Sequence, residues 1–277
     1  MREAISRYMT VDRDGQSWHF LCNTSQHRAI ISEMSSWARR GISVKRHCGG
    51  YKCEATTLEG FIQQLAVAYV ARRYFFYVTG FVSQRLTSEE HDRRLLAKYE
   101  VARSKWSRYR RRQRNGPDGR PLANVQYLRY RDFWVLLATR GSHRFFEEHA
   151  PCENDPNGKP QYRDIRESPI CYGGYSISWR ERVSVRMSRT AYRDLKSHFL
   201  CLATSSPSTN VLEQEFRRFP FEPYGGVYRQ TLSIHRAVNR ARKTAGLRPV
   251  PKDCLRFKRR VLKPFEPIAE EVLPLAA

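Results

Sequence analysis

The first 56 residues alternate between stretches with the apolar spacing of strands and stretches with that of helices. Residues 18–22 form a short aromatic and apolar run that predicts a strand, and residues 24–40 carry apolar positions at helical spacing. Two alternating runs, 42–48 and 51–56, then meet at the pair Gly49-Gly50, which is typical of a two-residue hairpin turn. We therefore expect a strand, a helix and a hairpin in this order.

The next stretch adds a helix and a strand. Thr56 and Glu59 have the spacing of a capping box, and the apolar residues after them recur at helical spacing up to Arg72. Residues 74–82 are almost continuously aromatic or β-branched, which favours a central strand of a sheet. The resulting order, β-α-β-β-α-β, predicts a ferredoxin-like domain over residues 1–86.

A basic helix is predicted at the start of the second region, residues 87–204. Thr87 and Glu90 form another capping box. The helix that they begin is expected to continue as far as Trp106 and the arginines after it. Residues 115–119, rich in Gly, Pro and Asn, then break the helical pattern.

Antiparallel strands are predicted beyond that break. Alternating runs over 124–130 and 133–139 indicate a hairpin, and 170–179 and 183–187 indicate a further strand pair. Residues 150–162 are rich in Pro, Asn and Gly and predict an exposed loop.

Helices are predicted to fill the rest of the chain. One begins at Ser188, another covers about 209–219, and the last runs over about 227–245. We expect residues 205–277 to form a third, helical and strongly basic region. The fold class is therefore α+β: a ferredoxin-like N-terminal part, a β-rich middle and a basic helical C-terminal part.

Charge is unevenly distributed over these 277 residues. About 40% of them are hydrophobic, enough for a folded core, and the formal net charge is +23. Residues 98–120 carry nine basic and two acidic side chains, and residues 236–263 carry eleven basic and one acidic. Such clusters create a local potential that attracts polyanions, of which phosphate backbones are the commonest. DNA or RNA is the expected partner.

The first basic stretch mixes cations with aromatic side chains. This mixture can bind phosphates and stack on bases at the same time. Because Trp106 and Tyr109 lie three residues apart, they can instead anchor the helix to the core, and we favour that interpretation for these two residues. For the arginines we favour phosphate binding. The candidate binding residues of this stretch are Arg103, Lys105, Trp106, Arg108, Tyr109, Arg110, Arg111, Arg112 and Arg114.

The last predicted helix has a basic face opposite an apolar stripe. The connection before it, 219–226, is longer than the tight turn of a helix-turn-helix, so phosphate contact is favoured over base reading. The stripe comprises Ile234, Val238, Ala241 and Ala245. The candidate binding residues of this second stretch are Arg236, Asn239, Arg240, Lys243, Arg256, Lys258, Arg259 and Arg260.

A short segment near residue 146 offers side chains for catalysis. His143, Glu147 and His149 supply imidazoles and a carboxylate that can serve a metal or act as a general base. Tyr192 is a candidate nucleophile if a base or metal lies beside it. The favoured interpretation is instead structural: a helix start with Phe145 and Phe146 in the core and the charges outside. No cofactor is predicted, and Mg²⁺ or Mn²⁺ enters only if this segment is catalytic.

Several site classes are set aside. The sequence contains no His-x-His pair and none of the glycine patterns of P-loops, dinucleotide-binding turns or esterase elbows. The seven cysteines are scattered and odd in number, which favours reduced, buried thiols over a metal site. The apolar run 61–71 is too short to span a bilayer and no signal peptide is evident, so we expect no membrane partner and a location in the cytoplasm or nucleoid.

Three functions stay open at this point. The first is a non-catalytic DNA- or RNA-binding protein, with replication, transposition or another mobile-element process as its candidate setting. The second is a metal-dependent or tyrosine-dependent endonuclease or strand-transfer enzyme. The third is a protein-interaction subunit of a nucleoprotein complex. The clustering of the charge favours the first.

Overall fold

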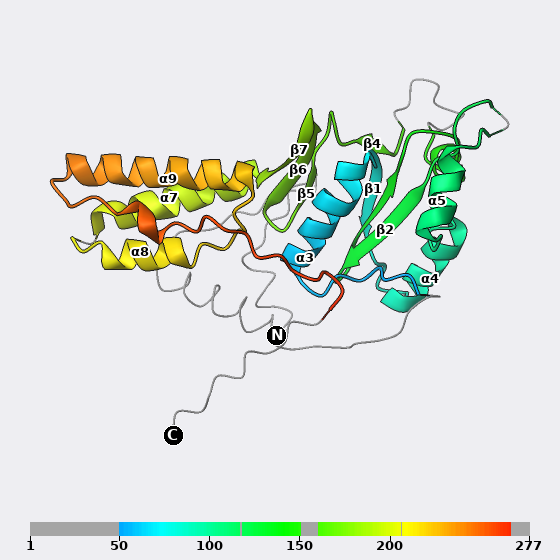
Figure 1. Ribbon diagram of the computed structural model, residues 1–277. Helices are drawn as coiled ribbons and strands as arrows, with labels where there is room; N and C mark the ends of the chain where they lie inside the picture. The colour runs from blue at the N-terminus through cyan, green and yellow to red at the C-terminus, as the bar shows by residue number, and fades with distance from the viewer. Residues whose placement is uncertain (1–49, 117, 151–159, 206, 267–277) are drawn as a thin grey trace. The chain divides into compact units, whose positions relative to one another are not determined.

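The computed structural model describes residues 50–116, 118–150, 160–205 and 207–266 (Figure 1). They divide into two compact units. The sheet unit comprises the described residues of 50–187, 219–229 and 256–266, and the helical unit comprises those of 188–218 and 230–255. The chain is α+β with antiparallel sheets, as expected.

Part of the predicted N-terminal fold lies outside the described residues. This applies to the strand at 18–22, the helix at 24–40 and the first hairpin strand at 42–48. The ferredoxin-like arrangement depends on them and stays a prediction, as do the domain boundaries after residues 86 and 204.

The larger sheet has four antiparallel strands in the order β2-β3-β1-β4. Its strands are β1 (Phe76–Phe81), β2 (Val125–Tyr130), β3 (Phe133–Ala138) and β4 (Arg163–Asp164). Tyr130 pairs with Phe133, which confirms the hairpin predicted at residues 131–132. Beside β2, the Ala55 amide donates to the Arg129 carbonyl at 2.8 Å, so a short parallel segment extends this edge.

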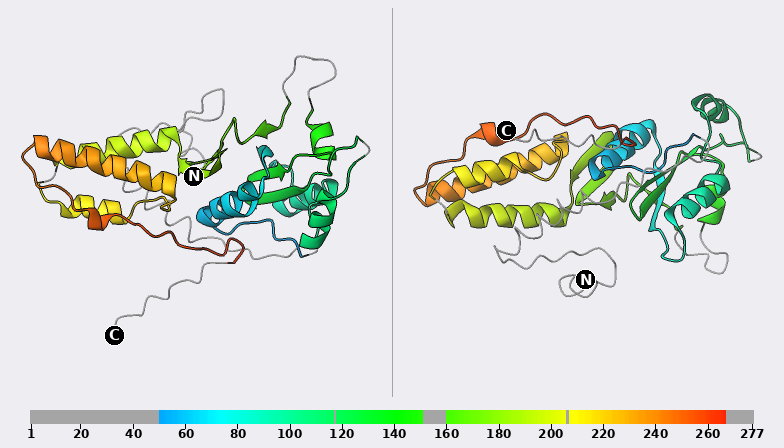
Figure 2. Two further views of the ribbon diagram at one scale, coloured as in Figure 1. Left: turned by 45° about the horizontal axis from the view of Figure 1, so that its top comes forward. Right: turned by 90° about the horizontal axis from the view of Figure 1, so that it is seen from below.

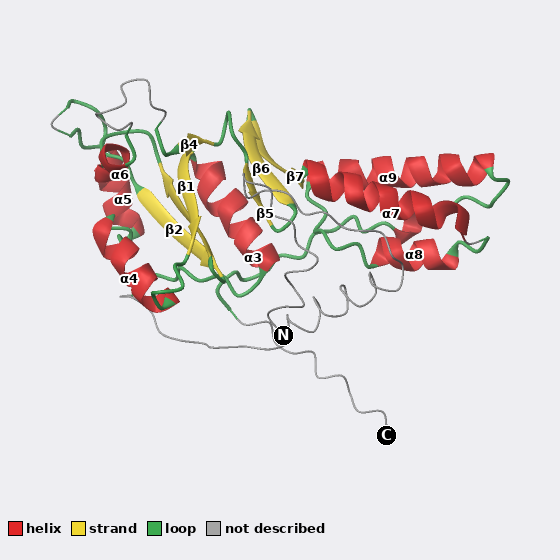
Figure 3. Ribbon diagram, turned by 180° about the vertical axis from the view of Figure 1, so that it is seen from behind, coloured by secondary structure: helices red, strands yellow, loops and turns green. Residues whose placement is uncertain are grey.

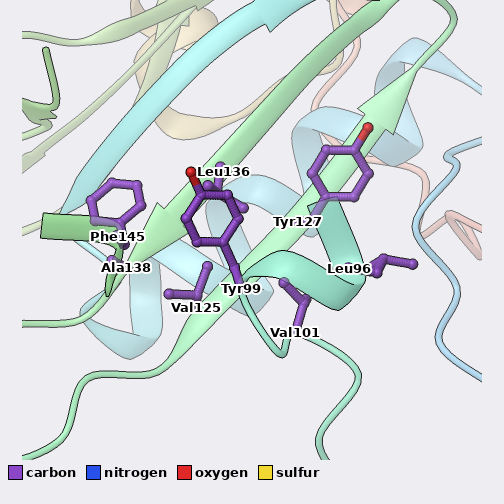
Figure 4. Packing of buried hydrophobic residues seen from close by; sticks show 8 residues of the cluster. All are labelled: Leu96, Tyr99, Val101, Val125, Tyr127, Leu136, Ala138 and Phe145. Carbon is purple, nitrogen blue, oxygen red and sulfur yellow. The ribbon is translucent and has the colours of Figure 1, made fainter. Parts of the chain in front are cut away.

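Helices cover both faces of this sheet, α3 (Leu58–Gln63) on one side and α4 (Ser88–Lys98) with α6 (Arg144–Glu148) on the other (Figures 1 and 3). Because side chains of a strand alternate between faces, Tyr127 points to α4 while Leu128 points to α3. Figure 4 shows the core on the α4 side. Its buried members are Leu96, Tyr99, Val101, Val125, Tyr127, Leu136, Ala138 and Phe145.

The second sheet packs against α3 on its other side. It is the meander of β5 (Ile170–Tyr172), β6 (Tyr175–Arg180) and β7 (Arg182–Met187), in the order β5-β6-β7. The turn between β5 and β6 is Gly173-Gly174, at φ 56° and 77°, a conformation that favours glycine. The predicted pairing with 183–187 is therefore confirmed for β6, but the run 170–179 forms two strands, β5 and β6, rather than one.

The helix after residue 56 begins one residue later than predicted and ends at Arg72-Arg73 as predicted, but it is not α-helical throughout. Its N-cap is Thr57 rather than Thr56, and the Thr57 hydroxyl accepts from the Gly60 amide at 3.0 Å. Beyond α3 the backbone continues as a π-helical stretch, Gln64–Tyr69, and a 3-10 turn, Val70–Arg72. It ends where Arg73 adopts a left-handed φ of 69°.

The prediction of one long helix from Thr87 to the arginine cluster is wrong in one respect. Thr87 caps α4 as predicted, but α4 ends at Lys98 and a separate helix, α5, spans Lys105–Arg112. Between them Glu100 has a φ of 50°, outside the helical range. This turn changes the direction of the chain and gives α5 a surface of its own.

The helical unit packs α7 (Arg189–Ser205), α8 (Asn210–Arg217) and the greater part of α9 (Gly225–Thr244) against one another (Figure 2). All three helices lie close to their predicted positions. The stacked rings of Phe199 and Phe216, 4.3 Å apart, lie in its core with Ile234 and Val238. Ala245 is exposed and does not belong to the apolar stripe, because α9 ends at the preceding residue.

Candidate nucleic-acid interface

Helix α5 presents most of its cations to solvent. The Ser104 hydroxyl caps its first turn by accepting from the Ser107 amide at 3.1 Å. Its last turn holds three consecutive arginines, Arg110 to Arg112, which the negative end of the helix dipole stabilises. None of its eight residues is acidic, and none is buried. The helix is therefore strongly cationic and makes few contacts with the rest of the sheet unit.

Trp106 and Tyr109 lie on the exposed side of α5 and do not anchor it. Their side chains are 62% and 56% exposed. Their rings stack on each other, with centroids 5.5 Å apart and planes inclined by 13°. The Arg110 guanidinium lies 5.4 Å from the Trp106 ring centroid. The interpretation of these aromatics as core anchors is wrong, because helical spacing alone does not say which face of a helix meets the core.

A cavity of about 640 Å³ runs between α5 and the π-helical stretch, and we call it the basic groove. Among the described residues that line it, six are basic and none is acidic. The basic residues are Lys52, Arg72, Arg103, Lys105, Arg108 and Arg112. Sequence reasoning found the four that lie near α5 and missed Lys52 and Arg72, which reach the groove from other elements.

Tyrosines form much of the floor of the basic groove. The Tyr51 hydroxyl donates to the Tyr127 carbonyl at 2.8 Å and lies 3.4 Å from the Tyr69 hydroxyl. Arg108 donates to the Gln126 amide oxygen at 3.3 Å, so a cation of the wall is tied to the floor. Burial, above all, raises the pKa of both Tyr51 and Tyr69, and the two hydroxyls stay neutral. The floor is polar and uncharged.

Two arginines of the first basic stretch pair with Glu100. Arg103 donates a hydrogen bond to Glu100, and this bond is the main cause that lowers the pKa of the Glu100 carboxyl. Arg111 lies 3.6 Å from the same carboxylate and donates from Nε to the Ala123 carbonyl at 2.8 Å. The Arg111 side chain is only 17% exposed. Arg111 therefore attaches α5 to the strand edge, while Arg110, Arg112 and Arg114 stay exposed.

The basic face of α9 lies on the helical unit. Arg236, Arg240 and Lys243 are exposed, as their spacing predicts. Asn239 is turned to the protein instead: its amide nitrogen donates to the Val250 carbonyl at 3.0 Å and its oxygen accepts from the Val250 amide at 2.8 Å. It holds the chain that follows α9, so its assignment to the basic face is corrected.

Arg242 was not among the expected inward-facing residues, yet it is fully buried in the helical unit. Its guanidinium donates to three carbonyls, those of Arg248 at 2.6 Å, Ala203 at 3.0 Å and Pro207 at 2.7 Å. An arginine inside a basic run carries no sequence signal that separates it from its exposed neighbours.

The basic residues from Arg256 onward belong to the sheet unit and are partly paired. Arg256 forms an ion pair with the buried Glu222 at 2.5 Å. Arg259 donates to the Gln63 side chain at 2.8 Å and lies 4.9 Å from the centroid of the Tyr224 ring. Lys258 and Arg260 are exposed. Arg256 and Arg259 attach this segment to the sheet unit. Lys258 and Arg260 add charge to its surface.

His143 and Glu148 have structural environments. The buried His143 caps α6, because its Nδ1 accepts from the Phe145 amide at 3.0 Å. Burial, followed by the charge of Arg111, lowers the pKa of His143 to about 4. Glu148 accepts from Tyr99 at 2.7 Å and pairs with Lys98 at 2.7 Å; despite some desolvation, these partners lower its pKa to about 2.

The other catalytic candidates lie apart from a common centre. Glu147 is exposed, and His149 Nε2 lies 3.3 Å from the Tyr99 hydroxyl. Tyr192 belongs to the helical unit, where its hydroxyl lies 3.0 Å from that of Ser233. Across the described ranges, no three His, Cys, Asp or Glu side chains form a group suited to a metal ion. His143, Glu147 and His149 share one short segment but build no metal-binding arrangement there.

A buried ion pair supports the strand next to the groove. Arg129 and Asp92 are 3% and 5% exposed. The Arg129 guanidinium donates to both carboxylate oxygens of Asp92, at 2.9 and 3.0 Å. Tyr127 donates to the same carboxylate at 2.6 Å. Burial tends to lower the pKa of Arg129, but Asp92 outweighs it and raises that pKa. This network fixes β2 against α4, and its residues are not adjacent in sequence, so pattern reasoning missed it.

The cysteines are less buried than expected. Cys53 is half-buried and Cys254 is buried, but Cys171 and Cys201 are exposed. None of these four described cysteines forms a disulfide. No helix within the described part of the chain is long and apolar enough to cross a membrane.

Comparison with known proteins adds no relative from which a role could be transferred. No protein-family model, curated protein or solved structure matches this chain significantly.

Proposed function

We propose that this protein binds nucleic acid in the basic groove of its sheet unit, holding the phosphate backbone with the cations of the groove wall. One observation carries the proposal: the described lining of the groove holds six basic residues and no acidic one, beside an exposed stack of Trp106 on Tyr109. Phosphates need cations at close range, and bases need exposed aromatic faces. Both kinds of group meet along α5.

The mechanism is electrostatic capture with little reading of sequence. Guanidinium groups bind phosphate oxygens in bidentate fashion, and each neutralised phosphate releases bound counterions. If the six groove cations each contact a phosphate of a single strand, log K falls with log salt at a slope of about −4. Arg236, Arg240 and Lys243 on α9 form a second phosphate-contacting face on the helical unit.

The cell compartment and the fold of the N-terminal region belong to the same proposal. A nucleic-acid-binding role suits the cytoplasm or nucleoid, where free thiols such as Cys171 stay reduced. We retain the ferredoxin-like arrangement for residues 1–86. The nuclease and the protein-interaction subunit stay alternative predictions.

A binding titration tests the proposal. Fluorescence anisotropy of labelled DNA and RNA is measured over a salt series for the full chain and for Lys105→Gln/Arg108→Gln/Arg112→Gln. We expect the triple variant to bind at least tenfold more weakly at about 0.1 M salt, with a salt slope reduced by about 2. The control is Arg180→Gln/Arg182→Gln, which removes exposed charge from the β6–β7 turn outside the groove.

The outcomes are distinct. If the wild-type chain binds neither polymer at low salt, the proposal is wrong. If the control variant loses as much affinity as the groove variant, net charge rather than the groove carries the binding. Adding Mg²⁺ or Mn²⁺ to the same samples and running them on a denaturing gel tests the nuclease alternative.

A further inference from the structure

The exposed aromatic pair on α5 is unusual for a surface helix. Large apolar side chains left in water cost free energy that burial would recover, and contiguous ones mark binding sites more often than solitary ones. Trp106 and Tyr109 are both more than half exposed and are stacked on each other. Their rings are therefore already nearly parallel. A third ring that joins the stack needs this orientation.

This aromatic pair is continuous with the basic groove. Tyr109 contributes to the groove lining and also stacks on Trp106, so it belongs to both features. Lys105, the residue before Trp106, and Arg112, about one turn after Tyr109, line the groove as well. Inside it, the Arg112 guanidinium lies 5.9 Å from the centroid of the Tyr74 ring. A polymer in the groove thus meets cations and aromatic faces alternately.

Single and double strands differ in what they offer to such a surface. In a duplex the base faces are stacked inside, and only base edges are open in the grooves. In a single strand the base faces are available, and stacking on aromatic side chains is the usual way in which proteins hold them. A duplex can contact the cations of α5 but has no free base face for Trp106 or Tyr109.

We infer that the basic groove selects single-stranded nucleic acid, with phosphates on the groove cations and an unpaired base stacked on the Trp106–Tyr109 pair. The inference rests on the proposed function and adds to it the strandedness of the ligand. Because every base has an aromatic face, the selection is for strandedness and not for sequence.

The test compares one sequence of about 20 nucleotides as a labelled single strand and as a blunt duplex, at equal salt. The wild-type chain is expected to bind the single strand at least tenfold more tightly. Trp106→Ala/Tyr109→Ala is expected to lose about tenfold or more on the single strand and less than about threefold on the duplex. Trp106→Phe/Tyr109→Phe, which keeps both aromatic faces, should retain most of the preference.

A matched control is the exposed aromatic Phe81, which is 70% exposed and lies outside the groove lining. Phe81→Ala should leave the ratio of the two affinities unchanged. A wild-type chain that binds both forms equally, or prefers the duplex, overturns the inference and leaves the proposed function standing. The inference is also overturned if the alanine variant loses affinity equally for the single strand and the duplex and the phenylalanine variant does the same. Failure of the wild-type chain to bind either form overturns both.

Discussion

The two basic helices, α5 and α9, look alike in sequence and differ in the structure. Each carries a run of Arg and Lys, and each turns one arginine inward, Arg111 in α5 and Arg242 in α9. The exposed side of α5 also carries Trp106 and Tyr109 and adjoins a groove. Along α9, all of which is described, the exposed residues include no large apolar side chain.

This difference separates two tasks that charge alone does not distinguish. A row of cations on a helix contacts any phosphate backbone and attracts it over several ångströms. Cations interleaved with exposed rings and set along a groove can in addition hold unpaired bases. On the proposed function, we therefore propose that the principal binding site lies at α5 and that α9 makes an auxiliary phosphate contact.

The largest expected effect tests the inward arginine of α9. Arg242→Met removes the donor to the carbonyl of the buried Ala203 and to those of Pro207 and Arg248, and should lower the free energy of unfolding of the helical unit by about 3–5 kcal/mol. Urea unfolding, together with hydrogen exchange of the α9 amides, measures it. Arg240→Met on the outer face of the same helix is the control and should change stability by less than about 0.5 kcal/mol. If Arg242→Met and Arg240→Met lower the free energy of unfolding equally, the distinction between inner and outer arginines is wrong.

The pH dependence of stability tests His143 as a neutral cap. Its pKa is about 4 in the folded chain, against about 6.5 when unfolded. The unfolded chain therefore binds the proton first, and stability that is complete above pH 6.5 is lost as the pH falls through 4, by up to about 3 kcal/mol. His143→Asn keeps a capping acceptor without this titration and should flatten the profile between pH 6.5 and 4. An unchanged profile would show that His143 is not the group responsible.

The inward arginine of α5 should affect stability more than binding. Arg111→Gln loses its bond to the Ala123 carbonyl and its pairing with Glu100, and should destabilise the sheet unit by about 1–2 kcal/mol. Its neighbour Arg112 is exposed in the groove, so Arg112→Gln should weaken binding severalfold without loss of stability. Thermal unfolding and anisotropy on both variants measure this. The reverse pattern would contradict the orientation of α5.

The smallest effect is expected from the outer face of α9. Arg236→Gln/Arg240→Gln/Lys243→Gln should reduce affinity about two- to fivefold, for single and double strands alike, because these cations contact phosphates only. Binding is compared with that of the groove variant at equal salt. If the α9 variant loses more affinity than the groove variant, α9 rather than α5 provides the principal contact.

Local signals in the sequence were sufficient for most elements of the described fold. Thr87 predicted the start of α4, and the apolar alternation on either side of residues 131–132 predicted the β2–β3 hairpin. These features depend on neighbouring residues, whose capping and turn geometry is decided locally. The break between α4 and α5 was missed, because Tyr99 and Val101 continue an apolar pattern while Glu100 adopts a left-handed conformation.

The composition of the site could be predicted only in part. Clustering identified the arginines of α5, but not that Lys52 and Arg72 would join them, since these come from distant parts of the chain. The orientation of Trp106 and Tyr109 was not predicted either. Residues three apart share a helix face whether that face meets the core or the solvent, and tertiary packing decides between the two.

The most direct test of the account is to locate bound nucleic acid on the chain. A single strand of about 20 nucleotides carrying 4-thiothymidine is crosslinked to the wild-type protein by ultraviolet light, and the modified peptides are mapped by mass spectrometry. The account predicts adducts on Trp106, Tyr109 and Tyr74, which disappear when unlabelled single strand competes. Adducts confined to α9 and the residues after it, with α5 unmodified, would contradict it.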